Sequence, residues 1–289
     1  MKKILITGGS GFIGSHVVNF LIKKKNRVTV YDLKSPQRSD VKFIKGSILD
    51  KNLINFALKN IDIIYHLAAV SDINKVKSIP VKTIETNILG TTYLLEAARK
   101  SRIERFVFAG SIYSYGNAGN VYTTSKTASE DIIKDYQLLY GLPFTILRYS
   151  TAYGPKNRSV DAISIFVRQA LKNSSLTVHG NGRQKRNYIY VEDLAEGSMI
   201  ALKNISKNKT VTLSSNKNIK IVDLAKTIIK LTRSKSKIII NKKKKRFDDY
   251  NSSSAELQSK KNLLVWKPKY SLTNGLKKYI NFKKNFFNK

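Results

Sequence analysis

Tyr122 and Lys126 are the residues whose types and spacing point most directly to chemistry. They lie four apart in a stretch of helical periodicity, so both side chains are expected on one face of a helix. A free tyrosine has a pKa of about 10 and is a weak base at neutral pH, but a neighbouring ammonium stabilises the phenolate. Ser111 follows a strand-like run, where its hydroxyl can hold a substrate oxygen against Tyr122. The three residues predict a catalytic site in which Tyr122 moves a proton.

A glycine-rich turn follows the first apolar run of the chain, at residues 8–14. Gly8 allows a tight turn, Gly11 lets the backbone approach a pyrophosphate, and Gly14 lets the next helix pack closely on the strand. The N-terminus of that helix offers N–H donors and the positive end of its dipole to phosphates. The turn therefore predicts a dinucleotide-binding site.

Asp32 ends the second strand-like run, 18 residues beyond Gly14. A carboxylate at this place can accept both ribose hydroxyls and repels a 2′-phosphate, which favours NAD over NADP. Lys34 and Arg38 lie close by in the sequence and weaken that preference.

Short apolar runs alternate with helical stretches through the first half of the chain, which argues for βαβ units. We therefore expect an α/β fold with a Rossmann-type, doubly wound parallel sheet. The expected strands are residues 3–7, 27–31, 42–44, 61–66, 105–109 and 144–147, and the expected helices are residues 13–24, 52–59, 81–100 and 125–140.

The alternation loosens after Gly154-Pro155, which predicts a smaller, mainly C-terminal α/β lobe for the substrate. We expect a dinucleotide-binding domain over residues 1–154 and the substrate lobe over residues 155–289. The chain is expected to re-enter the first domain near residues 186–203.

Composition excludes several classes of protein. The 289 residues contain no cysteine, which excludes disulfides, thiolate metal sites and a cysteine nucleophile. The three histidines lie far apart in the sequence, so no metal site is expected. No apolar run reaches the length of a transmembrane helix, and the N-terminus enters a strand without room for a signal peptide. These features predict a cytoplasmic protein that does not interact with a membrane.

The formal net charge of +34 is large for a chain of this length, and the excess is greatest after residue 200. Such a field attracts nucleic acid and phosphorylated metabolites. However, no basic stripe is interleaved with aromatic residues, so nucleic acid is not the expected partner. The lysine run at residues 242–245 is interpreted as a solvated loop.

Several motifs together resemble the extended short-chain dehydrogenase/reductase family, in its NAD-dependent epimerase/dehydratase branch, nearly from end to end. The resemblance implies a Rossmann fold, NAD as cofactor, a nucleotide-sugar substrate and a homodimer formed through helices 81–100 and 125–140. The motifs are Gly8-Gly9-Ser10-Gly11-Phe12-Ile13-Gly14, His66-Leu67-Ala68-Ala69, Asn87-x-x-Gly90-Thr91, Tyr122-x-x-x-Lys126, Leu147-Arg148-Tyr149, Tyr153-Gly154-Pro155, Tyr190-Val191-Glu192-Asp193-Leu194 and Trp266-Lys267-Pro268.

The resemblance also assigns contacts. Those to the cofactor are Gly8, Gly11, Phe12, Ile13, Gly14, Asp32, Ser47, Ile48, Leu67, Ala68, Ala69, Asn87, Tyr122, Lys126, Tyr149 and Ser150. Those to the substrate are Ser111, Thr151, Arg186 and Arg246. The two arginines match diphosphate-binding positions, which suit the planar fork of a guanidinium. His66 is expected to be a packed strand-end residue rather than an acid or base.

The chain departs from the family pattern at several positions. Ser47, Thr151 and Asn187 stand where the family usually has aspartate, asparagine and aspartate. Ser111 and Tyr122 are only 11 residues apart, whereas this branch usually inserts a longer loop. Part of the rim of the active site is therefore expected to be trimmed.

The segment Ser111-Ile112-Tyr113 lacks the Asp-Glu pair that sugar 4,6-dehydratases use and the glutamate of the related decarboxylases. Elimination of water needs a carboxylic acid to protonate the leaving hydroxyl, so oxidation and re-reduction at one carbon is the simpler chemistry. The sequence predicts an NAD-dependent nucleotide-sugar epimerase, in the first place a UDP-hexose 4-epimerase. The alternatives are a reductase or dehydrogenase of a nucleotide-linked keto-sugar and, in a different class, a catalytically idle Rossmann protein that binds nucleic acid.

Overall fold

The computed structural model describes residues 1–115, 120–157, 161–242 and 266–287, and every statement about structure concerns these residues. The chain forms two compact units. The first consists of residues 1–149 and 195–213, and the second of residues 150–194 and 214–289.

The first unit is built on a seven-stranded parallel sheet in the order β10-β6-β5-β4-β1-β2-β3. This arrangement confirms the expected Rossmann-type fold, because the first six strands take the order 3-2-1-4-5-6. The strands are β1 (Lys3–Thr7), β2 (Arg27–Asp32), β3 (Lys42–Lys45), β4 (Ile63–His66), β5 (Arg105–Ser111), β6 (Phe144–Tyr149) and β10 (Lys209–Leu213).

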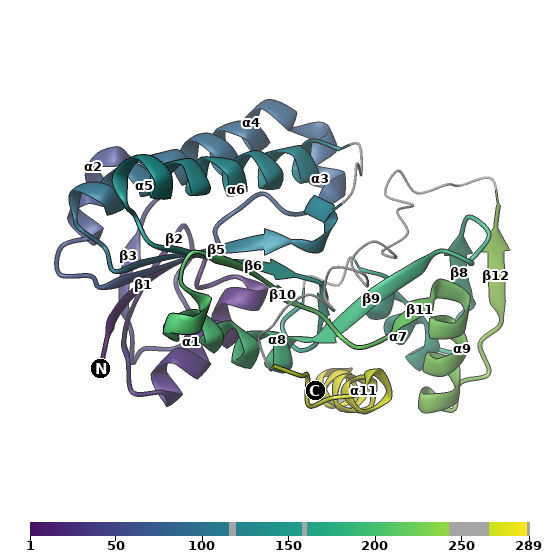
Figure 1. Ribbon diagram of the computed structural model, residues 1–289. Coiled ribbons are helices and arrows are strands. Elements are labelled where there is room, and N and C mark those ends of the chain that lie inside the picture. Colours follow the sequence, from purple (N-terminus) through teal and green to yellow (C-terminus); the bar gives the residue numbers. More distant parts are fainter. Residues whose placement is uncertain (116–119, 158–160, 243–265, 288–289) are drawn as a thin grey trace. The chain divides into compact units, whose positions relative to one another are not determined.

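Helices cover both faces of this sheet, with α4, α5 and α6 on one face and α1 on the other (Figure 1). The central strands are therefore apolar on both sides, and Ile4, Leu5 and Ile6 of β1 are fully buried. The helices of this unit are α1 (Phe12–Lys23), α2 (Lys51–Ala57), α3 (Ile73–Ser78), α4 (Pro80–Ile84), the π-helix η1 (Glu85–Leu89), α5 (Gly90–Lys100), η2 (Ile112–Tyr115), α6 (Val121–Tyr140), η3 (Ser198–Leu202) and η4 (Asn204–Ser206).

The expected helical stretch over residues 81–100 is helical throughout, but part of it is a π-helix. The π-helix η1 separates α4 from α5, and its wider turn leaves the Asn87 carbonyl open to side-chain donors. Such π-bulges are frequent at functional sites.

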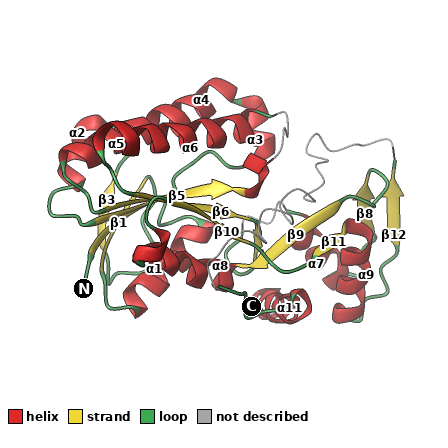
Figure 2. Ribbon diagram, in the orientation of Figure 1, coloured by secondary structure: helices red, strands yellow, loops and turns green. Residues whose placement is uncertain are grey.

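In its described residues, the second unit shows two small sheets, the helices α7, α9 and α11, which pack around a shared apolar core, and α8 (Figure 2). In the larger sheet, β9 (Lys185–Tyr190) pairs with β7 (Thr151–Tyr153) in parallel and with β11 (Asn218–Lys220) in the antiparallel sense. The remaining elements are β8 (Leu176–His179), β12 (Ile238–Asn241), α7 (Ala162–Leu171), α8 (Val191–Gly197), which crosses the boundary between the units, α9 (Ile221–Thr232) and α11 (Leu272–Phe287).

The boundaries of the two units differ from the expected ones. The first unit ends at Tyr149, and the chain returns to it from Ala195 to Leu213, a range that overlaps the expected re-entry near residues 186–203 but begins and ends about ten residues later. The reason is the pairing of β9, which belongs to the second unit through both of its neighbouring strands.

The described residues contain neither a membrane-spanning helix nor a metal-binding cluster. No helix there is long and apolar enough to cross a membrane. No group of three side chains of the metal-binding types comes together in them.

Candidate active site

Tyr122 lies in the first turn of α6, where the local sequence begins the helix. The side chain of Asn120 caps α6, since its Oδ1 accepts the N–H of Thr123 at 2.9 Å. Lys126 follows one turn later on the same face. Ser111 is the last residue of β5. The strand end and the helix start thus bring together the three residues that the sequence selects.

A hydrogen bond joins the side chains of Tyr122 and Ser111. Burial raises the pKa of Tyr122 to about 12, and the bond with Ser111 offsets only part of that rise. This result corrects the expectation that Lys126 by itself lowers the pKa of the phenol. In this structure, loss of hydration outweighs the attraction of the ammonium.

Lys126 is almost fully buried, with 4% of its surface exposed. Its Nζ donates to the carbonyl of Ala109 at 2.8 Å and lies 4.5 Å from the centre of the Phe108 ring. Burial lowers the pKa of Lys126 to about 8, although the charge of Glu130 acts in the opposite direction. The ammonium is therefore held at a fixed place by β5, one helical turn below Tyr122.

The turn after β1 has the geometry that a dinucleotide requires. Gly8 has a φ of +72°, and a Cβ on Gly14 would lie 2.1 Å from the Gly8 carbonyl oxygen. Around Gly11 the only close atom is the same oxygen, at 3.1 Å, so its other side is open. No side chain caps α1, whose first turn includes the expected contacts Phe12 and Ile13. The uncapped N–H groups fit a pyrophosphate.

Asp32 is held at the end of β2 by two backbone donors. Its Oδ2 accepts the N–H of Ser10 at 3.0 Å, and its Oδ1 accepts the N–H of Lys34 at 3.1 Å. Each oxygen keeps a further lone pair that can accept a ribose hydroxyl. Arg38 donates to Asp40 and to Asn19, both at 2.6 Å, so its guanidinium already has partners.

The residues expected along the rest of the cofactor lie at strand ends of the same sheet. The Ser47 Oγ accepts the N–H of Leu49 at 3.2 Å, and Ile48 packs in the core against Gly90. Leu67 and Ala68 donate their N–H groups to Thr7, and Ala69 follows them directly. Their contacts with a cofactor remain predictions.

Asn87, in the π-helix, connects this edge of the sheet to α6. Its amide group accepts the N–H of Val70 at 2.8 Å and donates to the Val70 carbonyl and to the Ser125 Oγ. Ser125 in turn donates to the Tyr122 carbonyl at 2.8 Å. Asn87 thus fixes the first turn of α6, in agreement with the orienting role that the resemblance implies.

His66 is a packed residue at the end of β4, as expected. Its Nδ1 lies 2.7 Å from the Thr7 Oγ1 and its Nε2 lies 2.9 Å from the Thr91 Oγ1. Because the Thr91 hydroxyl donates to the Asn87 carbonyl, Nε2 must donate and Nδ1 must accept. Burial, together with the charge of Lys126, lowers the pKa of His66 to about 3, so the ring is neutral.

Tyr149 and Ser150 lie on either side of the division between the units. The Tyr149 hydroxyl is hydrogen-bonded to the Ser198 Oγ at 2.9 Å, within the first unit. The Oγ of Ser150 and the Oγ1 of Thr151, which belong to the second unit, are buried and have no hydrogen-bond partner among the described residues.

Arg186 lies in β9 of the second unit, largely buried, and its Nη1 donates to the Lys185 carbonyl at 3.1 Å. The neighbouring Asn187 bonds to Ser215 and Asn218, so this departure from the family pattern has a structural role. Arg246 and residues 243–245 of the lysine run lie outside the described residues.

Two charged residues beside the site, Glu130 and Arg148, have no role assigned to them from the sequence, although Arg148 lies in one of the motifs. Glu130 lies one turn beyond Lys126 on α6, fully buried, and forms an ion pair with Arg148 of β6 at 2.6 Å. The signal was present in the spacing, since Tyr122, Lys126 and Glu130 follow one another at intervals of four residues.

Comparisons with known proteins agree with this geometry. The sequence profile of the NAD dependent epimerase/dehydratase family matches residues 4–214. A putative UDP-glucose 4-epimerase of Methanocaldococcus jannaschii is 34% identical, with 98% of each chain covered. A UDP-N-acetyl-alpha-D-glucosaminuronate decarboxylase of Bacillus cytotoxicus is 31% identical, with 97% of each chain covered. The crystal structure of UDP-glucose 4-epimerase with UDP-glucose from Thermotoga maritima has a TM-score of 0.87 at 25% identity, with 99% of each chain covered.

The chain belongs to the NAD dependent epimerase/dehydratase family, whose members modify nucleotide sugars, and NAD is its cofactor. The relatives include both an epimerase and a decarboxylase, so membership alone leaves the individual reaction open.

Proposed function

We propose that the protein is an NAD-dependent nucleotide-sugar 4-epimerase that acts on a UDP-hexose. The observation that carries this proposal is the hydrogen-bonded pair of Tyr122 and Ser111, together with the lack of a carboxylate in the segment Ser111-Ile112-Tyr113. A hydroxyl proton can be moved at this site, whereas a leaving hydroxyl has no neighbouring acid on that segment to protonate it. The similarity to UDP-glucose 4-epimerases supports the same reaction.

In the proposed reaction, the Tyr122 Oη takes the proton of the sugar 4-hydroxyl and later returns it. Ser111 holds the same oxygen by hydrogen bonding and so orients it toward the phenol. Lys126 supplies the positive charge that favours the phenolate during the proton transfer. NAD, when bound, supplies the hydride acceptor and donor at carbon 4. Rotation of the keto-sugar between the two transfers inverts the carbon.

Two residues of the second unit are proposed substrate contacts. Arg186 suits the diphosphate, because a guanidinium can bond two phosphate oxygens at once. The hydroxyl of Thr151, which has no partner among the described residues, can bond a sugar or phosphate oxygen. Arg246 is proposed as the second diphosphate contact on the resemblance alone.

The test of the reaction is mass spectrometry of UDP-, dTDP- and GDP-sugars that have been incubated with the protein and NAD. A product of unchanged mass that elutes as the 4-epimer supports the proposal. Loss of one water identifies a dehydratase, loss of carbon dioxide a decarboxylase, and a mass change of two hydrogens a net reductase or dehydrogenase.

We expect the protein to bind NAD at least about tenfold more tightly than NADP, because the fixed carboxylate of Asp32 repels a 2′-phosphate. Asp32→Asn keeps the shape of the side chain and removes its charge, so the two affinities should approach each other. Isothermal titration calorimetry measures both. Equal or tighter NADP binding by the wild type would show that Lys34 and Arg38 decide the preference instead.

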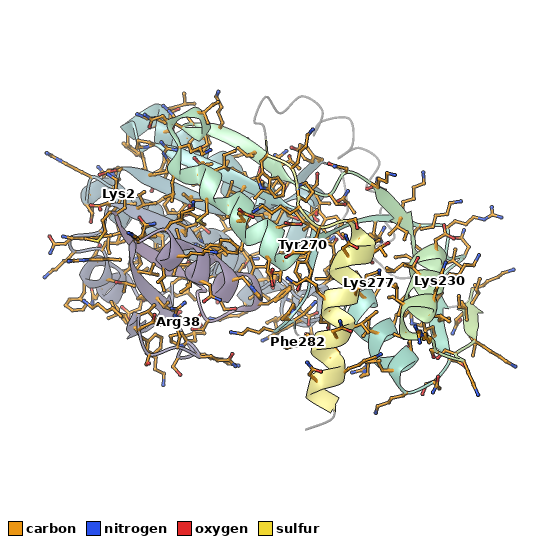
Figure 3. The ribbon with its side chains drawn as sticks, turned by 90° about the horizontal axis from the view of Figure 1, so that it is seen from below. Lys2, Arg38, Lys230, Tyr270, Lys277 and Phe282 are labelled. Atoms are coloured by element: carbon orange, nitrogen blue, oxygen red, sulfur yellow. The ribbon has the colours of Figure 1, made fainter. Side chains whose placement is uncertain are left out.

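Exposed apolar side chains on two packed helices support a homodimer as the proposed assembly. Val81 and Ile84 on α4 are 69% and 47% exposed, and Leu138 and Leu139 on α6 are 77% and 71% exposed. Apolar side chains that stay exposed on a folded surface can mark an interaction site. The exposed residues of the second unit include cations such as Lys230 on α9 and Lys277 on α11 (Figure 3).

The double change Val81→Glu and Leu139→Glu should therefore give a monomer of 32.7 kDa, because it places carboxylates in the proposed interface. Size-exclusion chromatography with light scattering measures the mass. Phe56→Glu, at an exposed position on α2, is the control and should leave the dimer intact. A wild-type protein that is monomeric at micromolar concentration would refute the assembly.

A further inference from the structure

Glu130 is a buried carboxylate placed beside the proposed proton path. It shares a face of α6 with Lys126 and Tyr122, and its side chain has no exposed surface. Gly110 of β5 makes room for it, since a Cβ there would lie 2.6 Å from the Glu130 Oε1. Strand and helix are thus shaped to admit a charge at this place.

Arg148 is the partner that makes this burial possible. Its Nε and Nη2 donate to the Glu130 Oε2 at 2.9 and 2.6 Å. Its guanidinium carbon lies 4.2 Å from the ring of Tyr115, whose hydroxyl bonds to the Thr212 Oγ1 at 2.5 Å. Tyr115 ends η2, the short helix that follows Ser111. The ion pair is therefore fixed from three elements, β6, α6 and η2.

A buried ion pair is a poor source of stability, because well-packed apolar residues of similar volume stabilise a core as well or better. The effect of the ion pair on the charge of neighbouring side chains therefore says more about its role than its effect on stability does. The groups that face Lys126 are Glu130, the neutral ring of His66 from β4 and the carbonyl of Ala109 from β5. Of these, only Glu130 raises the pKa of Lys126, and it also raises the pKa of Tyr122.

We propose that Glu130 is a positioning residue that keeps Lys126 in its ammonium form, and that Arg148 limits this effect by neutralising part of the carboxylate charge. Without Glu130, the burial of Lys126 would favour the uncharged amine. With an unpaired Glu130, the extra negative charge would oppose the phenolate that Tyr122 has to form. The ion pair of Glu130 and Arg148 thus keeps Lys126 charged without strongly opposing the ionisation of Tyr122. This inference rests on the roles of Tyr122 and Lys126 in the proposed function.

The test compares single and double substitutions in the protein without sugar. Glu130→Gln keeps the size of the side chain, removes its charge and leaves Arg148 unneutralised, so the pKa of Lys126 should fall by about one unit or more. Arg148→Met leaves Glu130 unpaired, so the pKa of Lys126 should rise. The double variant removes both charges, so its Lys126 pKa should lie between that of Glu130→Gln and that of the wild type. NMR of protein labelled with lysine ε-¹³C measures the titration, and Lys126→Met assigns the resonance.

Asp131→Asn is the matched control, because this exposed neighbour of Glu130 pairs only with Lys134 and should leave the Lys126 titration unchanged. If the two single variants shift the pKa of Lys126 in the same direction, or not at all, the proposal is wrong. If Arg148→Met does not fold, Glu130→Gln and the double variant decide, since the pKa of Lys126 must fall in the first and recover in part in the second.

The alkaline limb of the pH profile of kcat/KM, measured with the active sugar, should move in the same directions. The expected NMR shifts together with an unchanged rate profile would support the electrostatic role of Glu130 and refute the part that the proposed function gives to Lys126. The inference about Glu130 and the proposed role of Lys126 can therefore be refuted independently of each other.

Discussion

Tyr122→Phe should lower kcat by about 10² or more while NAD stays bound, which is the usual scale for a positioned acid–base group. The change removes the hydroxyl that is hydrogen-bonded to Ser111 and keeps the ring at the start of α6. Steady-state kinetics measures the loss, and calorimetry measures the affinity for NAD. Tyr140→Phe, at the exposed end of the same helix, is the control and should behave as wild type.

Ser111→Ala should cost less than Tyr122→Phe, because a water molecule can replace part of the bond that the serine makes. The double variant should be little worse than Tyr122→Phe alone, since residues that form one proton path fail together. Near-normal turnover of Tyr122→Phe, with an unaltered pH profile, would mean that the tyrosine is not the base.

Lys126→Met should have opposite effects on activity and on stability. Turnover should fall by about 10² or more, because the only ammonium placed next to Tyr122 on α6 is lost. The free energy of unfolding at pH 7 should rise by about 1 to 3 kcal/mol, because a buried charge is replaced by an apolar side chain of similar length. Urea unfolding measures the second effect.

The pH dependence of stability tests the cause of that gain. The folded protein lowers the pKa of Lys126 to about 8 from 10.5, so between these values the unfolded chain binds more protons than the folded one. The wild-type unfolding free energy should therefore gain a rising contribution from about pH 8 to pH 10.5, with a slope of up to about 1.4 kcal/mol per pH unit. Lys126→Met should lack this contribution. Equal slopes in the two proteins would show that the lysine is not held in an apolar environment.

The sheet was predictable because its signals are local. The apolar runs and the glycine turn lie within single elements, and the ends of β1 and β2 appear where these signals predict them. Helix α6, by contrast, begins at Val121, four residues before the expected start at residue 125. Parallel order then places the carboxyl ends of the strands at one edge, which is why Ser111 and Tyr122 could be expected to meet.

The charges around the site were not predictable in the same way, because they depend on side chains from separate elements. Burial of Lys126 results from its packing against β5, and that of Glu130 from its pairing with Arg148 of β6. The rise in the pKa of Tyr122 follows from the same packing. Likewise, the π-helix around Asn87 shows no sequence signal that distinguishes it from an α-helix.

The two alternatives to an epimerase differ in what they require. A keto-sugar reductase would use the same residues and needs a stoichiometric supply of reduced cofactor, so only the product balance separates it from an epimerase. An idle protein that binds nucleic acid would have no chemical use for the bonded pair of Tyr122 and Ser111. Binding of RNA or DNA with a steep salt dependence would identify such a protein.

The cytoplasmic location of the protein remains a prediction from the sequence.

The most direct test of the proposed function is incubation of UDP-glucose labelled with deuterium at carbon 4 with the protein and NAD. The 4-epimerase mechanism predicts UDP-galactose of unchanged mass with the deuterium still on carbon 4, because the same hydrogen returns to the carbon that lost it. NMR and mass spectrometry of the product locate the label. A product that has lost water, has its deuterium on carbon 6, or forms only in proportion to the added cofactor would contradict the account.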